Sequence, residues 1–212
     1  MEILKEISAS LQQGDDKKVF ALTRQAIEEK IPPEEILEKA LIGGMKVVGE
    51  RFKIHEIFLP DVLLAAKAMS AGMRLLEPFF IKEGIPTLGK VVIGTVQGDL
   101  HDIGKNLVSV MLTGAGFEVI DLGSNVTPEK FIETAKQENA PVIGMSALLT
   151  TTMPVMGSVV ELLKQEGLNG KIKTVIGGAP VSEEFAQKIG ADAYGYDSTN
   201  AVESVKRLLN KS

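Results

Sequence analysis

The sequence contains no cysteine and no tryptophan, and only two of its 212 residues are histidine, His55 and His101. Without cysteine the chain cannot form a disulfide, a thiolate zinc site, an iron–sulfur cluster or a cysteine nucleophile. A single imidazole cannot hold a free metal ion alone. Any metal must therefore rest on histidine and carboxylates together, or enter the protein inside a cofactor.

The chain also lacks a strong charge of either sign and a long apolar run. Its 23 Lys and Arg against 28 Asp and Glu give a formal net charge of -5, whereas nucleic-acid binding needs a strongly basic face. The first residues carry acidic side chains and lack the basic and apolar regions of a signal peptide. No uncharged apolar run reaches the ~18 residues of a membrane span. These absences predict a soluble, cytoplasmic protein that binds neither nucleic acid nor a membrane.

What is present changes character near residue 85. Before it, apolar residues recur at helical spacing, and acidic or proline residues stand where helices begin. This pattern predicts a small antiparallel bundle over residues 1–85. Its four helices are expected at 2–13, 16–30, 33–51 and 58–83. Glycine and proline between residues 84 and 89 predict a linker.

Residues 90–212 alternate short β-rich runs with helical segments, which predicts an α/β domain. The expected strands are 90–95, 117–121, 142–146, 174–176 and 191–195. The expected helices lie near 103–115, 127–138, 152–167, 181–189 and 199–210. Such an order favours a doubly wound, five-stranded parallel sheet of Rossmann or flavodoxin-like type. Ligands of these sheets bind beyond the carboxyl ends of the strands.

Three turns on that edge are rich in glycine and hydroxyl side chains, at 98–106, 146–152 and 177–180. None contains the glycine fingerprint of a dinucleotide or nucleoside triphosphate site. The first turn instead places His101 between Asp99 and Asp102. Asp99 can accept from one ring nitrogen while the other points outward, as in metal-bound histidines. A solvated or helix-capping histidine remains an alternative, as does an ordinary turn at the Gly177–Gly178 pair.

Taken together, these turns resemble the corrinoid (cobalamin-binding) proteins of methyltransferase systems and the cobalamin-binding region of methionine synthase. The family motifs D-x-H-x-x-G, S-x-L and GG are met in order by Asp99, His101 and Gly104, by Ser146 and Leu148, and by Gly177 and Gly178. The segment GERFKIHEIFLPDVLLAAKAMS (49–70) resembles the helical cap of the family. The resemblance therefore covers nearly the whole chain.

The resemblance implies a role for each motif residue. His101 becomes the lower axial ligand of cobalt, Asp99 holds its other ring nitrogen, and Thr152 stands where methionine synthase has a serine that completes this relay. Further cofactor contacts are implied for Gly98, Leu100, Asp102, Ile103, Gly104, Ser146, Leu148, Thr150, Gly177, Gly178 and Ala179. Lys105 either neutralises the phosphate of the nucleotide tail or is exposed.

In the cap, the resemblance implies that Phe52, Leu59 and Val62 shield the upper face of the corrin and that Glu38 is a polar contact. Apolar residues at this spacing are also typical of a helical core, so both interpretations stay open.

The implied function is a cobalamin-binding methyl carrier. It accepts a methyl group on cobalt from a donor-specific methyltransferase and delivers it to an acceptor methyltransferase that serves a pterin or a thiol. Methyl-cobalt(III) tolerates a nitrogen ligand and cobalt(I) does not, so His101 should bind in one half-cycle only. A reductive activator is a further expected partner, and the chain should not turn over alone. The donor cannot be read from the sequence.

Two alternatives remain. A cobalamin-responsive regulator is disfavoured because no segment resembles a basic DNA-binding helix. The small subunit of an adenosylcobalamin mutase shares D-x-H-x-x-G, but the helical cap argues against it.

Overall fold

The computed structural model describes residues 2–80 and 87–210. They form two compact units that divide between Thr87 and Leu88, with residues 114–116 grouped with the first unit. The predicted helix residues 81–83 and the first half of the predicted linker, 84–86, lie outside the described residues. No helix among the described residues is both long and apolar enough to cross a membrane.

The first unit is helical throughout. Its elements are α1 (Glu2–Gln12), α2 (Asp16–Glu28), α3 (Pro33–Glu35), η1 (Ile36–Ile42), α4 (Gly43–Lys53) and α5 (Leu59–Phe80). Asp15 caps α2 by accepting from the Lys18 amide at 2.9 Å, and Pro33 occupies the first turn of α3. These are the start signals that the sequence offers.

The predicted single α-helix over 33–51 is wrong in its middle, because η1 is a π-helix. Buried residues along this stretch come in neighbouring pairs that repeat every fourth position, at 36–37, 40–41, 44–45 and 48–49. A step of four residues turns an α-helix ~40° beyond a full turn, so such pairs drift away from the core. The wider π turn removes part of that drift. All four pairs can then face the core from the same side of the helix.

The second unit contains a five-stranded, wholly parallel sheet in the order β2-β1-β3-β4-β5. The strands are β1 (Lys90–Thr95), β2 (Glu118–Asp121), β3 (Val142–Ser146), β4 (Lys173–Gly177) and β5 (Ala193–Gly195). The helices are α6 (Ile103–Gly114), α7 (Pro128–Gln137), α8 (Pro154–Gln165), α9 (Glu183–Ile189) and α10 (Ser198–Leu208). The predicted α/β class is confirmed.

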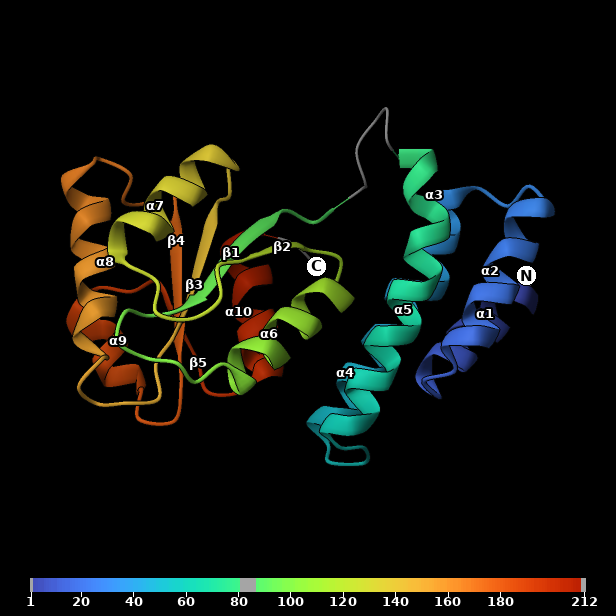
Figure 1. Ribbon diagram of the computed structural model, residues 1–212, viewed down its shortest axis with the longest axis horizontal. Coiled ribbons are helices and arrows are strands. Elements are labelled where there is room, and N and C mark those ends of the chain that lie inside the picture. The colour runs from blue at the N-terminus through green and yellow to red at the C-terminus, as the bar shows by residue number, and fades with distance from the viewer. Residues whose placement is uncertain (1, 81–86, 211–212) are drawn as a thin grey trace. The chain divides into compact units, whose positions relative to one another are not determined.

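Helices cover both faces of this sheet, with α7, α8 and α9 on one side and α6 and α10 on the other (Figure 1). On the first side, Ile143 of β3 and Phe131 of α7 are fully buried within one apolar cluster. After β2 the chain returns across β1 to form β3, so the winding direction reverses between β1 and β3. The carboxyl ends at such a reversal are where ligands of doubly wound folds bind.

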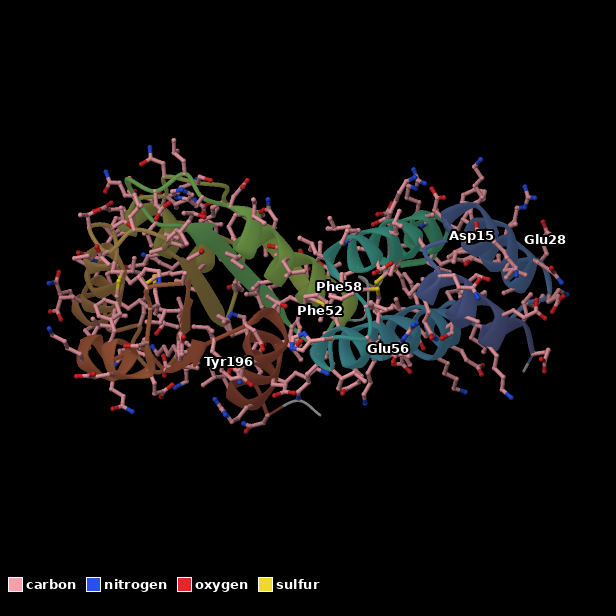
Figure 2. The ribbon with its side chains drawn as sticks, turned by 90° about the horizontal axis from the view of Figure 1, so that it is seen from below. Asp15, Glu28, Phe52, Glu56, Phe58 and Tyr196 are labelled. Atoms are coloured by element: carbon pink, nitrogen blue, oxygen red, sulfur yellow. The ribbon has the colours of Figure 1, made fainter. Side chains whose placement is uncertain are left out.

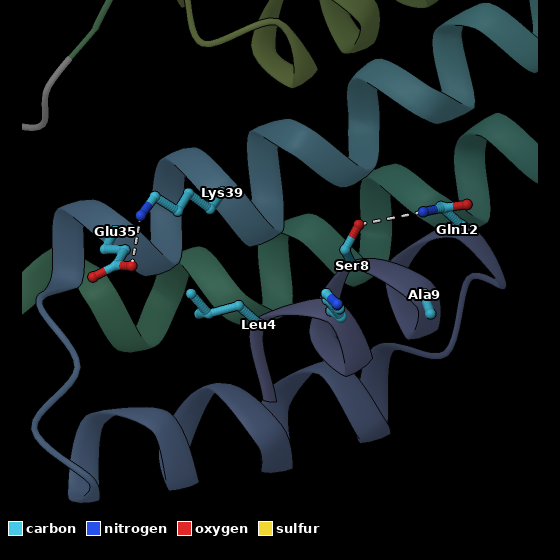
Figure 3. A pocket seen from close by; sticks show the side chains of 7 residues that line it. Leu4, Ser8, Ala9, Gln12, Glu35 and Lys39 are labelled. Carbon is cyan, nitrogen blue, oxygen red and sulfur yellow. Dashed lines mark hydrogen bonds and ion pairs between the residues drawn. The ribbon is translucent and has the colours of Figure 1, made fainter. Parts of the chain in front are cut away.

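A shallow pocket of about 430 Å³ lies in the helical unit, lined by residues of α1, α3 and η1 (Figure 3). Its polar groups bond to each other: Gln12 donates to Ser8 at 3.2 Å, and Lys39 pairs with Glu35 at 2.7 Å. None of the predicted site residues lines it. The candidate site therefore lies elsewhere, at the strand ends of the sheet.

Candidate cobalamin site

The turn after β1 buries a single carboxylate. The Asp99 amide donates to the Val96 carbonyl at 3.1 Å, which closes a four-residue turn, and Gly98 in its third position has a φ of 85°. A type II turn requires a positive φ there, which glycine adopts without strain. The side chain of Asp99 is 0% exposed.

Asp99 holds His101 twice with one oxygen. Oδ1 of Asp99 accepts from the ring Nδ1 of His101 at 2.7 Å and from its backbone amide at 3.1 Å. Because an ionised carboxylate only accepts, Nδ1 must carry the hydrogen. The lone pair of the neutral ring then lies on Nε2.

The other oxygen of Asp99 joins this turn to the loop after β3. Oδ2 accepts from the backbone amides of Leu148 at 2.8 Å and Leu149 at 3.1 Å, and from the hydroxyl of Thr152 at 3.0 Å. The Thr152 hydroxyl also lies 2.9 Å from the Leu149 carbonyl, so its one proton is shared between two acceptors. The predicted trio of Asp99, His101 and Thr152 is thus brought together at the winding reversal.

These hydrogen-bond donors keep the buried Asp99 side chain ionised. Burial by itself raises the pKa of Asp99, but the hydrogen bonds from His101, Leu148 and Thr152 outweigh it and hold the pKa well below its usual range. Asp99 is therefore a carboxylate at neutral pH. A fixed negative charge at Nδ1 makes the opposite ring nitrogen a better metal ligand.

The outer side of the imidazole is open. The side chain of His101 is 52% exposed, and no described residue donates to or accepts from Nε2. No group of three or more His, Asp or Glu that could hold a metal ion occurs among the described residues. His101 can therefore supply one ligand to a metal that is otherwise held by a cofactor.

The surface around His101 fits a large apolar ring system. Leu100 and Ile103 are each 75% exposed, and Leu148 and Leu149 are 43% and 40% exposed. Exposed leucine and isoleucine in one place are typical of a binding surface. Gly104 has no atom within 4 Å of where a Cβ would stand, so the space next to its Cα is open.

The turn after β4 packs against the turn after β3. Gly178 has a φ of 129°, and a Cβ there would run into the carbonyl oxygen of Ala147. The Ala147 amide in turn donates to the Gly177 carbonyl at 3.2 Å. The predicted residues Ser146, Thr150 and Ala179 lie on these two turns, half-buried in the case of Ser146 and exposed in the other two.

Residues 89–206 match a family model described as a B12 binding domain, and residues 3–77 match a second model with the same description. The chain belongs to the B12-binding corrinoid proteins. It therefore binds cobalamin or a related corrinoid, as the motifs predicted.

Relatives match over nearly the whole length. The dimethylamine corrinoid protein of Methanosarcina barkeri is 48% identical over 210 residues, which cover 98% of this chain and 98% of the relative. A trimethylamine corrinoid protein of Methanosarcina mazei is 42% identical, with 98% and 97% covered. A corrinoid protein of Desulfitobacterium hafniense is 40% identical, with 100% and 99% covered.

Solved structures agree. The methanol:cobalamin methyltransferase complex of Methanosarcina barkeri contains a chain that matches with a TM-score of 0.92 at 30% identity, covering 100% of this chain and 81% of that one. A cobalamin-binding protein of Desulfitobacterium hafniense matches with a TM-score of 0.78 at 33% identity, covering 97% and 98%. The helical unit and the sheet unit are thus both found in corrinoid proteins.

In this corrinoid protein, the predicted cap residues differ in exposure. Val62 is 0% exposed, so its side chain belongs to the helical core. Phe52 and Leu59 are half-buried, and Glu38 is exposed in the first turn of η1. Phe58, which the sequence did not single out, is 66% exposed where α4 gives way to α5 (Figure 2). The role of these side chains at the corrin stays a prediction.

Two further charged residues of the turn after β1 have different surroundings, and the cofactor contact of Asp102 stays a prediction. Asp102 is exposed and makes no contact with the ring of His101, so only one of the two flanking carboxylates orients it. Lys105 is not exposed: its side chain is 1% exposed, and its Nζ pairs with Asp121 at 2.5 Å. Its charge is balanced within the protein.

Sequence reasoning missed three groups that hold the turn carrying His101. Thr95, buried at the end of β1, donates its hydroxyl to the His101 carbonyl at 2.9 Å. The amide of Leu149 adds to that of Leu148, and Asn125 contacts the turn from the loop after β2. Asn125 follows the predicted strand 117–121, and this position beyond the carboxyl end of a strand is the sequence signal that marks it.

Proposed function

We propose that this corrinoid protein carries a methyl group between two methyltransferases. The observation that carries the proposal is the Asp99–His101 pair, whose Nε2 is free to bind cobalt, in a chain matched over nearly its full length by corrinoid proteins of methylamine systems. These relatives favour a methyl carrier over the sensor and mutase-subunit alternatives.

We further propose a methylamine as the methyl donor, with dimethylamine as the first to test. Dimethylamine corrinoid proteins are 45–48% identical to this chain, against 42% for the trimethylamine relative. The monomethylamine and methanol proteins of known structure are 33% and 30% identical. The donor is chosen by the partner enzyme, so identity in the carrier reports which partner surface it fits.

The corrinoid supplies a cobalt atom that takes up the methyl group and gives it away. His101 would hold that cobalt through Nε2, and Asp99 fixes the ring by holding Nδ1. The contact between Asp99 and Nδ1 does not involve Nε2, so it can hold the ring whether or not Nε2 binds metal. Thr152 and the two leucine amides keep that carboxylate in place while the ring changes state.

The helical unit is proposed to shield the upper face of the corrin and to move aside for each partner. Phe52, Leu59 and Glu38 stay candidates for contact because their side chains reach the surface. Val62 would act only through the core it packs in. The expected partners are a methylamine methyltransferase, an acceptor methyltransferase and a reductive activator, and the proposed location is the cytoplasm.

The test is a reconstituted methylation assay. The protein is loaded with cobalamin, reduced, and mixed with one donor at a time, each with and without the methyltransferase specific for it: dimethylamine, trimethylamine, monomethylamine or methanol. We expect the visible spectrum to report methylation of cobalt with dimethylamine and only when the methyltransferase is present.

Methylation only with another of these donors and its own methyltransferase would contradict dimethylamine as the donor, but would still support the carrier function. No methylation with any matched pair, or methylation without any methyltransferase, would contradict the carrier function itself.

A further inference from the structure

Asn125 contacts the histidine turn at two main-chain atoms. Its Oδ1 accepts from the Gly98 amide at 2.8 Å, and its own amide donates to the Asp99 carbonyl at 3.0 Å. These two atoms are the beginning and the end of the Gly98–Asp99 dipeptide. Asn125 therefore holds the backbone on either side of the buried carboxylate, whereas Leu148, Leu149 and Thr152 donate to the carboxylate itself.

The backbone of Asn125 is shaped for this position. Its φ is 58°, in the left-handed region, which asparagine tolerates better than most residues with a Cβ. In this conformation the amide N–H and the side-chain oxygen of one residue both reach the same turn. The left-handed backbone of Asn125 is thus used to make a contact at the candidate site.

The loop that carries Asn125 has a fixed register against β1. The Val126 amide donates to the Thr95 carbonyl at 3.0 Å, the Thr95 amide donates to the Gly123 carbonyl at 2.9 Å, and Val96 and Val126 form a parallel bridge. The loop thus continues the pairing of β1 with β2 past the end of the strands. Asn125 meets the histidine turn from a segment that cannot slide along it.

The same loop is also tied to the helix that follows His101. Oδ1 of Asp121 accepts from the Gly123 amide at 2.8 Å, while Oδ2 pairs with the buried Nζ of Lys105 in the first turn of α6. The segment from Gly98 to Lys105 is therefore joined at both ends to one stretch of chain, residues 121–125.

We propose that Asn125 is a positioning residue for the cobalt ligand: by fixing Gly98 and Asp99 it keeps the carboxylate where it orients the imidazole of His101. This inference rests on the proposed function, in which His101 binds cobalt.

The test compares two glycine substitutions in the full-length protein. Asn125→Gly keeps the left-handed backbone and removes the side-chain contact. Asn139→Gly is the matched control, because Asn139 has a φ of 51°, is exposed, and follows α7 just before β3, at the opposite edge of the sheet. Both proteins are loaded with cob(II)alamin, and electron paramagnetic resonance measures the ratio of histidine-bound to histidine-free cobalt from the nitrogen splitting.

We expect Asn125→Gly to lower this ratio about fivefold, the equivalent of the ~1 kcal/mol of one ordinary hydrogen bond, and Asn139→Gly to leave it unchanged. Asn125→Asp keeps an acceptor oxygen at the same place and should restore most of the ratio. Without cofactor, the Gly98 amide should exchange its hydrogen faster in Asn125→Gly than in the wild type.

An unchanged ratio in Asn125→Gly, an equal fall in both glycine variants, or no recovery in Asn125→Asp overturns the positioning role. Wild-type protein without histidine-bound cobalt overturns His101 as the ligand, and the role of Asn125 with it. The wild-type spectrum therefore separates failure of the proposed function from failure of this inference.

Discussion

Oδ1 of Asp99 accepts two hydrogen bonds from His101, one from the ring at 2.7 Å and one from the backbone at 3.1 Å. The acid thus fixes both the position of the residue and the rotation of its ring. Asp99 is fully buried while His101 is half exposed, so the pair has an anchored end and a free end. That asymmetry suits a ligand that must bind and release a metal without losing its place.

The buried charge of Asp99 should appear in the stability of the protein without cofactor. Since the pKa of Asp99 is lower when folded than when unfolded, its contribution is complete above pH ~4 and is lost as the pH falls through the folded value. We expect Asp99→Asn to cost about 2–4 kcal/mol at pH ~6, from the lost charge-assisted hydrogen bonds. The difference in free energy of unfolding between wild type and Asp99→Asn should become smaller between pH ~4 and pH ~2.

Urea unfolding at several pH values measures this difference. The control is Asp16→Asn, because Asp16 is a surface acid whose pKa is lowered mainly by its hydrogen bond to Lys67, and exposed pairs contribute little. A gap between Asp99→Asn and wild type that stays constant down to pH ~2 would show that Asp99 is not held as a carboxylate.

Thr152 should act through its hydroxyl group. In Thr152→Val the Oδ2 atom of Asp99 keeps its two backbone donors and loses the third, which should cost about 1.5–3 kcal/mol in the free energy of unfolding. Thr152→Ser keeps the donor and should lie within ~1 kcal/mol of the wild type. Equal stability of the two variants in denaturant titrations would contradict this role.

Substitutions of two glycines should have different effects, one on stability and the other on cofactor binding. Gly178→Ala should destabilise the protein without cofactor by more than ~2 kcal/mol, because the new methyl meets the Ala147 carbonyl at a strained φ. Gly104→Ala meets no atom and lies in the first turn of α6, so stability should be unchanged or slightly raised. If the corrin binds beside His101 as proposed, the cobalamin affinity of Gly104→Ala should nevertheless fall at least ~10-fold, because the new methyl would take up space that the cofactor needs.

Calorimetric unfolding and cobalamin titration of the same two proteins provide these values. If Gly104→Ala binds cobalamin as tightly as the wild type, the open space beside Gly104 does not belong to the cofactor.

The ion pair of Lys105 should matter more than an exposed one. Lys105→Met fills the same space without the charge and leaves Asp121, which is 39% exposed, to be hydrated. We expect a loss of about 1–2 kcal/mol. Lys39→Met breaks the pair between the exposed Lys39 of η1 and Glu35 of α3, and should change stability by less than ~0.5 kcal/mol. Similar values for both variants in urea unfolding would contradict a structural role for Lys105.

Much of the fold could be predicted from local sequence. The strands β1 and β3 begin and end at the predicted residues, because strands of a buried parallel sheet are apolar over most of their length and are easily recognised. The strand β5 starts two residues later than the predicted 191, because the Asp192 side chain takes the Thr174 amide at 2.9 Å in place of a strand contact. Such competition by a side chain is not visible in periodicity.

The candidate site, too, could be predicted only in part. Asp99 and His101 are two residues apart, so their contact follows from any tight turn and could be predicted. The donors Leu149 and Asn125 come from distant segments, and a backbone amide carries no residue type that would mark it. The π turn at η1 could not be predicted, because apolar residues that repeat every fourth position over a short stretch also fit an α-helix.

The central claim is that the imidazole of His101 binds cobalt in this protein. It is tested most directly by electron paramagnetic resonance of protein grown with nitrogen-15 histidine and loaded with unlabelled cob(II)alamin. If His101 is the lower ligand, the triplet splitting from nitrogen-14 becomes a doublet, and the splitting disappears in His101→Ala. A triplet that persists in the labelled protein, or a nitrogen splitting that survives in His101→Ala, would show that the cofactor keeps its own base on cobalt and would contradict the account.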